Sequence, residues 1–245
     1  MAAFSMKIAG YTAKVSSLFE STPQYFRTYL TQEAPTLFFT VTREELAAEQ
    51  TRLKEEALRE GMRIRVFPDP FLERSVIQQK FAQTLLRHDI LLLHGSTVAA
   101  DGKAYLFTAK CGTGKSTHTR LWRELLGDRA VMVNDDKPFL RFTPEGILAC
   151  GSPWSGKHGL DSNITVPLGG ICILERGQEN RIRPMSAAEA LPFLLTQCDP
   201  PEDENEMPRY HQLMETLTQR VPLWHMQCNK EIGAAQTAFD AMQKP

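Results

Sequence analysis

The stretch Tyr105-Leu-Phe-Thr-Ala-Lys-Cys-Gly-Thr-Gly-Lys-Ser-Thr117 decides how the rest of the sequence is interpreted. It contains an apolar strand, a glycine-containing loop and the start of a segment with helical spacing that continues to Leu126. Such a unit can cradle phosphate groups, because glycines let backbone N–H groups turn inward and a helix N-terminus adds positive potential. The sequence therefore predicts a phosphate-binding loop.

The loop matches the pattern G-x-x-x-x-G-K-[ST] except at its first position, which is Ala109. In this pattern Lys115 reaches the β- and γ-phosphates, and Ser116 offers an oxygen to Mg²⁺. The alternative is a strand–turn–helix corner that contains Gly-Lys-Ser by chance. We expect ATP and Mg²⁺ as the ligands, with the nucleotide held by Lys110, Cys111, Gly112, Thr113, Gly114, Lys115, Ser116 and Thr117.

Two adjacent carboxylates, Asp135 and Asp136, follow a second apolar strand candidate, residues 130–133. One carboxylate of such a pair can hold Mg²⁺ while the other acts as a base toward an attacking hydroxyl. Neighbours in a strand point to opposite faces, so both can reach one site only if the strand has ended there. We expect Asp135 to be the base and Asp136 to bind the metal together with Ser116, although the two carboxylates could exchange roles. A solvated acidic turn is the alternative.

Cationic side chains accompany these motifs. Lys137 directly follows the carboxylates, and Lys157 lies in a segment, 151–159, whose glycines, proline and cations indicate a mobile anion-contacting loop. His94 ends the apolar run 90–93, which suits a buried strand. Phosphoryl transfer spreads negative charge over oxygens that cations can stabilise. We expect Lys137, His94 and Lys157 in the catalytic site; the alternatives are solvated lysines and a core histidine.

Taken together, these segments resemble the kinases related to bacterial HPr kinase/phosphorylase, which share their nucleotide core with phosphoenolpyruvate carboxykinase. The resemblance covers approximately residues 85 to 185 and rests on Leu93-His-Gly-Ser-Thr-Val, Tyr105-Leu-Phe-Thr-Ala, Gly112-Thr-Gly-Lys-Ser-Thr and Val133-Asn-Asp-Asp. It implies that Lys115 binds phosphates, that Ser116 binds Mg²⁺, and that the two aspartates supply the base and a metal contact. His94 corresponds to a histidine ahead of the loop in that family.

The sequence also departs from that family. Ala109 and Cys111 replace the more usual Gly and Ser, and the long arginine-containing signature of true HPr kinases is not found. The segment 151–158 is instead similar to carboxykinase-related proteins, some of which phosphorylate peptide hydroxyls. The resemblance therefore implies an ATP-dependent, Mg²⁺-requiring kinase whose acceptor is a hydroxyl of a peptide, a protein or a small molecule. A nucleotide-binding regulatory protein and a simple ATPase are the alternatives. Relatives of this kind often assemble, which allows a homo-oligomer.

The expected fold is α/β with α+β character. Asp101-Gly102 is a strong hairpin signal, so the strand before the loop has an antiparallel neighbour and the sheet is mixed rather than mostly parallel. We expect a small α+β appendage over residues 1–70, which includes short strands at 37–41 and 62–67, and a carboxykinase-like core over residues 71–245.

The net charge, the cysteine content and the first residues of the chain argue against several classes of protein. A net charge of −1 over 245 residues argues against a nucleic-acid or anionic-membrane partner. The five scattered cysteines include no C-x-x-C pair, so we expect reduced thiols in a cytoplasmic protein. The first residues lack a basic region followed by a long apolar run, and we expect no signal peptide.

Overall fold

The computed structural model describes residues 1–59, 61 and 63–243 of the chain. The chain divides into two compact units, Met1–Thr84 and Leu85–Pro245, which are taken separately below. The expected division at residue 70 stays a prediction.

The first unit is built on a three-stranded sheet. Strands β1 (Ala2–Ile8) and β2 (Tyr11–Ser17) form an antiparallel hairpin, and β3 (Leu37–Thr40) lies parallel to β2. Its helical segments are α1 (Thr22–Tyr25), η1 (Arg27–Tyr29), α2 (Arg43–Arg59) and α3 (Asp69–Leu86), the last of which ends in the second unit. A capping box starts α2, because Thr42 N donates to Glu45 Oε2 (2.9 Å) and Glu45 N donates to Thr42 Oγ1 (3.3 Å).

The expected strand at residues 62–67 is wrong over its described part. Met62 lies outside the described residues, and residues 63–67 adopt no strand. The side chain of Gln50, on α2, takes the place of a neighbouring strand: its Nε2 donates to Arg65 O (3.1 Å) and its Oε1 accepts from Phe67 N (2.7 Å). Residues of high β-propensity in this segment, such as Val66, are left exposed.

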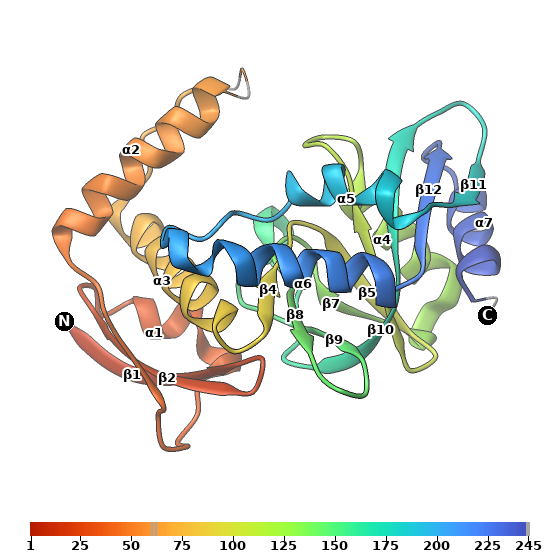
Figure 1. The fold of residues 1–245 in the computed structure, drawn as a ribbon. Coiled ribbons are helices and arrows are strands. Elements are labelled where there is room, and N and C mark those ends of the chain that lie inside the picture. Colours follow the sequence, from red (N-terminus) through yellow and green to blue (C-terminus); the bar gives the residue numbers. More distant parts are fainter. Residues whose placement is uncertain (60, 62, 244–245) are drawn as a thin grey trace. The chain divides into compact units, whose positions relative to one another are not determined.

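Within the described residues, the second unit contains a nine-stranded mixed sheet, which confirms the expected mixed α/β character. Its strands are β4 (Ile90–Leu92), β5 (Ser96–Ala100), β6 (Lys103–Thr108), β7 (Ala130–Asn134), β8 (Phe139–Phe142), β9 (Ile147–Cys150), β10 (Thr165–Arg176), β11 (Arg181–Pro184) and β12 (Leu223–Cys228). The main strand order is β4-β8-β9-β10-β6-β5-β7, and β12 pairs with both β10 and β11. Figure 1 shows these strands behind and beside the helices of this unit.

Strand β10 joins the two halves of this sheet. Its first residues, 165–167, pair antiparallel with β9, whereas its later part runs parallel to both β6 and β12. The hairpin at Asp101-Gly102 is confirmed: β5 and β6 are antiparallel, and both turn residues have positive φ, 50° and 79°. A positive φ at both central residues is the requirement of a tight type I′ turn.

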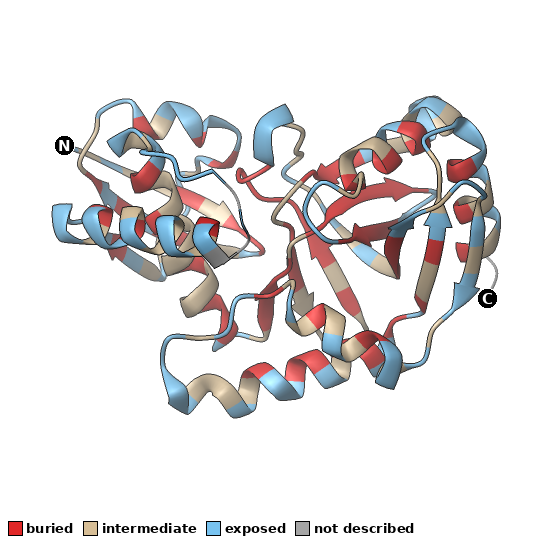
Figure 2. Cartoon of the chain, turned by 90° about the horizontal axis from the view of Figure 1, so that it is seen from above, coloured by how far each residue is buried: buried red, intermediate tan, exposed pale blue. Residues whose placement is uncertain are grey.

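Helices cover both faces of the large sheet. They are α4 (Lys115–Leu126), α5 (Ala187–Leu195), α6 (Met207–Arg220) and α7 (Ile232–Met242), with short turns η2 (Gly127–Arg129), η3 (Gly156–His158) and η4 (Glu204–Glu206). Along β6, Leu106 belongs to the core that contains α5 and α6, and its neighbours Tyr105 and Phe107 belong to the core that contains α4 and α7. This alternation is the two-residue period of a strand buried on both faces. The strands are accordingly mostly red in Figure 2, while the helices carry red and blue stripes.

Two helix starts lie beside the phosphate loop and the end of the large sheet. The helix after the phosphate loop begins at Lys115, directly after Gly114. The last helix begins at Ile232 with Glu231 as its N-cap residue. Asn229 donates from Nδ2 to Gln178 O (3.2 Å), which ties the end of β12 to the turn after β10.

Four chain segments meet at one edge of the large sheet. Strands β6 and β10 are parallel, and β10 continues for three residues, to Arg176, beyond Ile173, which lies opposite Thr108 at the end of β6. Strand β5 is antiparallel to β6 and β7, so the start of β5 and the end of β7 lie at this same edge, where Thr97 faces Asn134. The topology therefore brings together the residues that precede β5 and those that follow β6, β7 and β10.

None of the helices in the described part of the chain has the length and apolar character needed to span a bilayer.

Candidate active site

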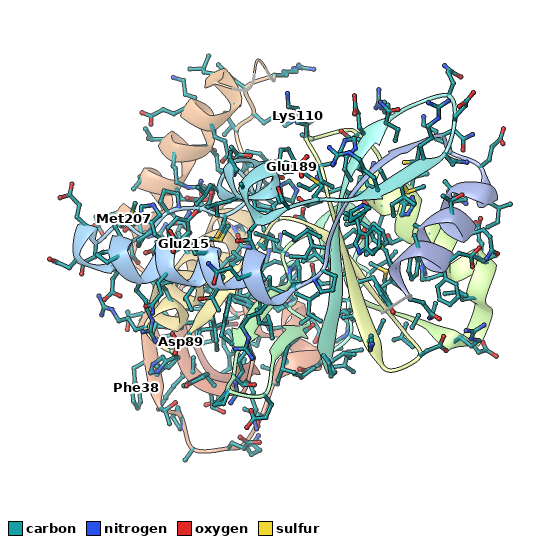
Figure 3. All side chains as sticks on the ribbon, turned by 45° about the vertical axis from the view of Figure 1, so that its right-hand side comes forward. Phe38, Asp89, Lys110, Glu189, Met207 and Glu215 are labelled. Carbon is teal, nitrogen blue, oxygen red and sulfur yellow. The ribbon has the colours of Figure 1, made fainter. Side chains whose placement is uncertain are left out.

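The loop between β6 and α4, which the sequence predicts to bind phosphate and which we call the phosphate loop, has a conformation that depends on its glycines. Gly112 and Gly114 have φ angles of 74° and 126°, which side-chain-bearing residues rarely adopt. Gly114 is the N-cap of α4 and offers no side-chain cap, so the first-turn N–H groups of the helix can face an anion. Lys110, labelled in Figure 3, and Cys111 are exposed in this loop, whereas Ala109 is buried.

Lys115 is held inside the loop. Its Nζ donates to Ala109 O at 3.1 Å, and the residue is 9% exposed. Burial lowers the pKa of Lys115, and the nearby charges of Asp136, Cys111 and Asp135 oppose that shift in part. The loop lysine and the two aspartates thus interact electrostatically. These three residues, far apart in the sequence, are therefore near one another in the folded chain.

Asp135 is the inner member of the carboxylate pair. It is 5% exposed, and its Oδ1 accepts a hydrogen bond of 2.6 Å from Ser96 Oγ, at the start of β5. Ser96 Oγ also lies 2.7 Å from Thr119 Oγ1, on α4. Because Ser96 Oγ donates its proton to Asp135, Thr119 Oγ1 is the donor to Ser96, and it also lies 3.4 Å from Lys115 O and 3.3 Å from Ser116 O. A chain of buried hydroxyls therefore links Asp135 to the first turn of the helix.

Asp136 is the outer member of the pair. Its side chain is 34% exposed, and its Oδ1 lies 3.1 Å from His94 Nε2. Burial alone would raise the pKa of Asp136, but the hydrogen bond and charge of His94, together with the charges of Lys137 and Lys115, hold the pKa below its ordinary value. A backbone bond from Gly95 N to Asp136 O (2.9 Å) fixes the two segments to each other.

Asn134 shapes the turn that carries the two aspartates, a role that was not expected from the sequence. Its Oδ1 accepts from Asp136 N (2.7 Å) and from Lys137 N (2.6 Å), which ends the strand at the carboxylates. Its Nδ2 donates to Ser152 O (2.8 Å) and thereby ties this turn to the glycine-rich segment. Asparagine side chains favour such local turns, so the Asn before the pair was the available signal.

The glycine-rich segment 151–159 lies against the carboxylate turn. A Cβ built on Gly156 would be 3.2 Å from Asp136 Cβ, so the segment passes directly over that side chain. Lys157 lies on the exposed turn η3, and among the described residues its ammonium forms no ion pair. Lys137 donates its backbone N–H to Asn134, while its charge acts on both Asp136 and Lys115.

Gly151 provides a stability prediction for this segment. A Cβ at this position would lie 1.8 Å from Ser162 O and 3.0 Å from Val133 O, two backbone atoms that cannot move aside cheaply. We expect Gly151→Ala to destabilise the protein by about 1–3 kcal/mol or more, measured as a lower midpoint of thermal unfolding. Gly146→Ala is the matched control, since nothing lies within 4 Å of its Cβ position. Equal midpoints for the two variants would contradict the close approach at Gly151.

A cavity of about 560 Å³ lies beside the phosphate loop. The loop and α4 contribute Thr113, Gly114, Thr117 and His118 to its wall, and the residues that end β10 contribute Leu174 and Arg176–Gln178. The segment Cys228–Glu231, which follows β12, completes it. Its size is within the range of about 300–1,000 Å³ that is typical of small-molecule sites.

His118 is a packing residue with one face toward this cavity. Its ring lies 4.5 Å from that of Phe107, and its Nε2 accepts from Trp122 Nε1 at 3.2 Å. Burial lowers the pKa of His118 to about 4, so the ring is neutral at physiological pH. It adds no positive charge to the phosphate loop.

The expected magnesium ligands carry oxygen atoms of the kind that this ion prefers. Mg²⁺ prefers oxygen ligands and is usually held by one or two carboxylates together with substrate phosphates. Ser116, Asp135 and Asp136 supply such oxygens. Within the described residues, no group of three or more His, Cys, Asp or Glu side chains is arranged to hold a metal ion by itself. All five cysteines are free thiols.

The sequence matches no protein-family model and no curated protein sequence. Among solved structures, the chain is similar to the Hpr(Ser) kinase/phosphatase from Coxiella burnetii, with 10% sequence identity and a TM-score of 0.36. The match covers 62% of this chain and 99% of that chain.

Proposed function

We propose that the protein is an ATP-dependent kinase that transfers the γ-phosphoryl group to a hydroxyl of a peptide, a protein or a small molecule. One observation carries the proposal: buried hydroxyls, those of Ser96 and Thr119, link the carboxylate of Asp135 to the helix that begins at Lys115. A loop that only binds nucleotide needs the lysine, whereas transfer to a hydroxyl also needs a base.

The two carboxylates could take the roles of base and metal ligand in either order. Their contacts favour the order in which Asp136 is the base and Asp135 is the metal ligand. Asp135 is buried, and hydroxyl side chains link it to the turn that carries Ser116, which suits a metal ligand. Asp136 is partly exposed and bonded to His94, which suits a base that an external acceptor must reach. We therefore propose Asp136 as the base and Asp135, with Ser116, as the metal side of the site.

The cationic residues and the histidine of the site have roles that follow from their positions in the structure. Lys115 and the N–H groups at the start of α4 bind the phosphates, and bound Mg²⁺ would neutralise charge on them. His94 keeps Asp136 ionised, so that it can accept the proton of the acceptor hydroxyl. Lys137 adds positive charge near the phosphates, and Lys157 is placed on the exposed turn where it can meet an incoming acceptor.

The cavity beside the loop supports a nucleoside triphosphate as the donor. It starts at Thr113 and Gly114, so a nucleotide with its phosphates on the loop would place its base and ribose there. Leu174 and Cys228 give the wall apolar surface, and the neighbouring Lys230 and Glu231 give it polar groups.

The test is to follow the label of γ-labelled ATP in the presence of Mg²⁺ and a cell extract. We expect label to appear on an acceptor as an acid-stable ester, and not to appear with a Lys115→Ala variant. Label that stays in ATP despite binding would indicate the regulatory protein. Label released as inorganic phosphate, whatever extract is added, would indicate the ATPase.

A further inference from the structure

Arg176, the last residue of β10, contacts the phosphate loop from outside. Its Nη2 donates to Gly112 O, and its Nε donates to Thr113 O at 3.3 Å. The sheet explains this contact, because β10 lies parallel to β6 with Ile173 opposite Thr108. The end of β10 thus lies next to the loop that leaves β6.

The loop has a conformation that needs support. It binds anions with its N–H groups, so the carbonyls of the same peptide units have to point away from the ligand. Gly112 and Gly114 permit this conformation, but glycine also has more backbone freedom to lose than other residues. The N–H of Thr113 donates to Lys110 O (3.2 Å) and so closes the turn of the loop. A guanidinium that holds the carbonyls of Gly112 and Thr113 on the outer side would keep this turn in place and favour the conformation in which the N–H of Gly114 faces the ligand.

We propose that Arg176 is a positioning residue, which holds the phosphate loop in its anion-binding conformation through the carbonyls of Gly112 and Thr113. The inference rests on the proposed function, since it requires that the loop bind phosphates. Arginine suits this role because its planar guanidinium presents several N–H donors in a fixed arrangement, whereas lysine offers a point charge on a flexible stem.

Arg176 also lines the cavity, which gives a second way in which it could act. If Arg176 only contacted the nucleoside, its loss would weaken the binding of ATP and leave the affinity for a bare polyphosphate unchanged. If it holds the loop, its loss affects every ligand that binds through phosphates. Inorganic tripolyphosphate, which has no base or ribose, separates these two roles.

The experiment measures the dissociation constants of ATP and inorganic tripolyphosphate, each with Mg²⁺, by titration calorimetry. We expect Arg176→Ala to weaken both ligands by a similar factor of about ten or more, because two hydrogen bonds from a charged donor are lost. Arg176→Lys should recover part of the affinity, and guanidinium ion added to Arg176→Ala at millimolar concentration should recover part as well. The thermal unfolding midpoint should stay within about 2 °C of the wild type, since loss of an exposed contact costs little stability.

Arg181→Ala is the matched control. Arg181 is an exposed arginine on the neighbouring β11, where it pairs with Glu179 and does not line the cavity. It should bind both ligands as the wild type does.

Three results would overturn the inference: wild-type affinities in Arg176→Ala, a loss confined to ATP, or a loss that guanidinium does not restore and that accompanies a lower unfolding midpoint. A wild-type protein that bound neither probe would overturn the proposed function as well, and the controls distinguish that result from the other three.

Discussion

Replacing Lys115 with alanine is expected to lower the rate of phosphoryl transfer by about 10²–10³-fold or more, because a charge that stabilises the transferring phosphoryl group is removed. The fold should persist. Burial lowers the pKa of Lys115, so the folded protein favours the charged ammonium less than water does. The measurement is transfer of label from γ-labelled ATP, alongside the affinity for tripolyphosphate and the thermal unfolding midpoint.

Arg120→Ala is the control for that substitution, because Arg120 is a cation on the same helix but is exposed, pairs with Glu124 and does not line the cavity. It should retain transfer within a few-fold of the wild type, since an exposed ion pair contributes little. Lys115→Met, which keeps the length of the side chain, should match Lys115→Ala in activity. Normal transfer in both Lys115 variants would show that the lysine is not the phosphate ligand.

The second large effect is expected at the carboxylate pair. Asp136→Asn should reduce transfer to the acceptor by about 10²–10⁴-fold, the usual contribution of a positioned base, while the affinity for Mg²⁺–ATP stays close to that of the wild type. Asp135→Asn should instead make ATP binding insensitive to Mg²⁺, because the buried carboxylate lies next to the turn that carries Ser116. Transfer assays and nucleotide titrations with and without Mg²⁺ check both outcomes.

The two substitutions serve as controls for each other, since each converts one carboxylate to a neutral amide of the same shape. If Asp135→Asn bound Mg²⁺–ATP normally but did not transfer, and Asp136→Asn lost the metal effect, the roles would be exchanged.

The pairing of His94 with Asp136 makes a prediction about pH. His94 lowers the pKa of Asp136, so the base stays deprotonated, and active, as the pH falls through the ordinary range of a carboxyl group. In His94→Gln that pKa rises, and the acidic limb of the profile of kcat/KM against pH should move to higher pH. An unchanged acidic limb would mean that Asp136 is not the group whose protonation limits the rate.

The parts of the site that are formed by consecutive residues could be predicted from the sequence. The strand, loop and helix around Lys115 are consecutive, and the turn at Asp101-Gly102 fixes the direction of the neighbouring strand with two residues. The tight turn and the helix start are set by backbone preferences of a few residues, which a single sequence displays directly.

The residues that were missed depend on the register of strands far apart in the chain. Ser96 meets Asp135 because β5 lies between β6 and β7, and Arg176 meets the loop because β10 pairs with β6. No local pattern marks a serine or an arginine for such a contact. The wrong strand at 63–67 has a related cause: alternation of apolar residues predicts a strand, but a strand also needs a partner, and Gln50 supplies those hydrogen bonds instead.

The packing of α4 against α7 has a consequence for when the growing chain gains affinity for nucleotide during synthesis. The helix that begins at Lys115 packs against α7 through a shared apolar core, with the rings of Trp122 and Phe239 centred 5.4 Å apart. Strand β12, which walls the cavity, also comes from this late part of the sequence. A ribosome therefore releases the phosphate loop long before the residues that support it. We expect the nascent chain to gain affinity for nucleotide only when α7 has emerged, so nucleotide binding reports that this unit of the chain has been completed.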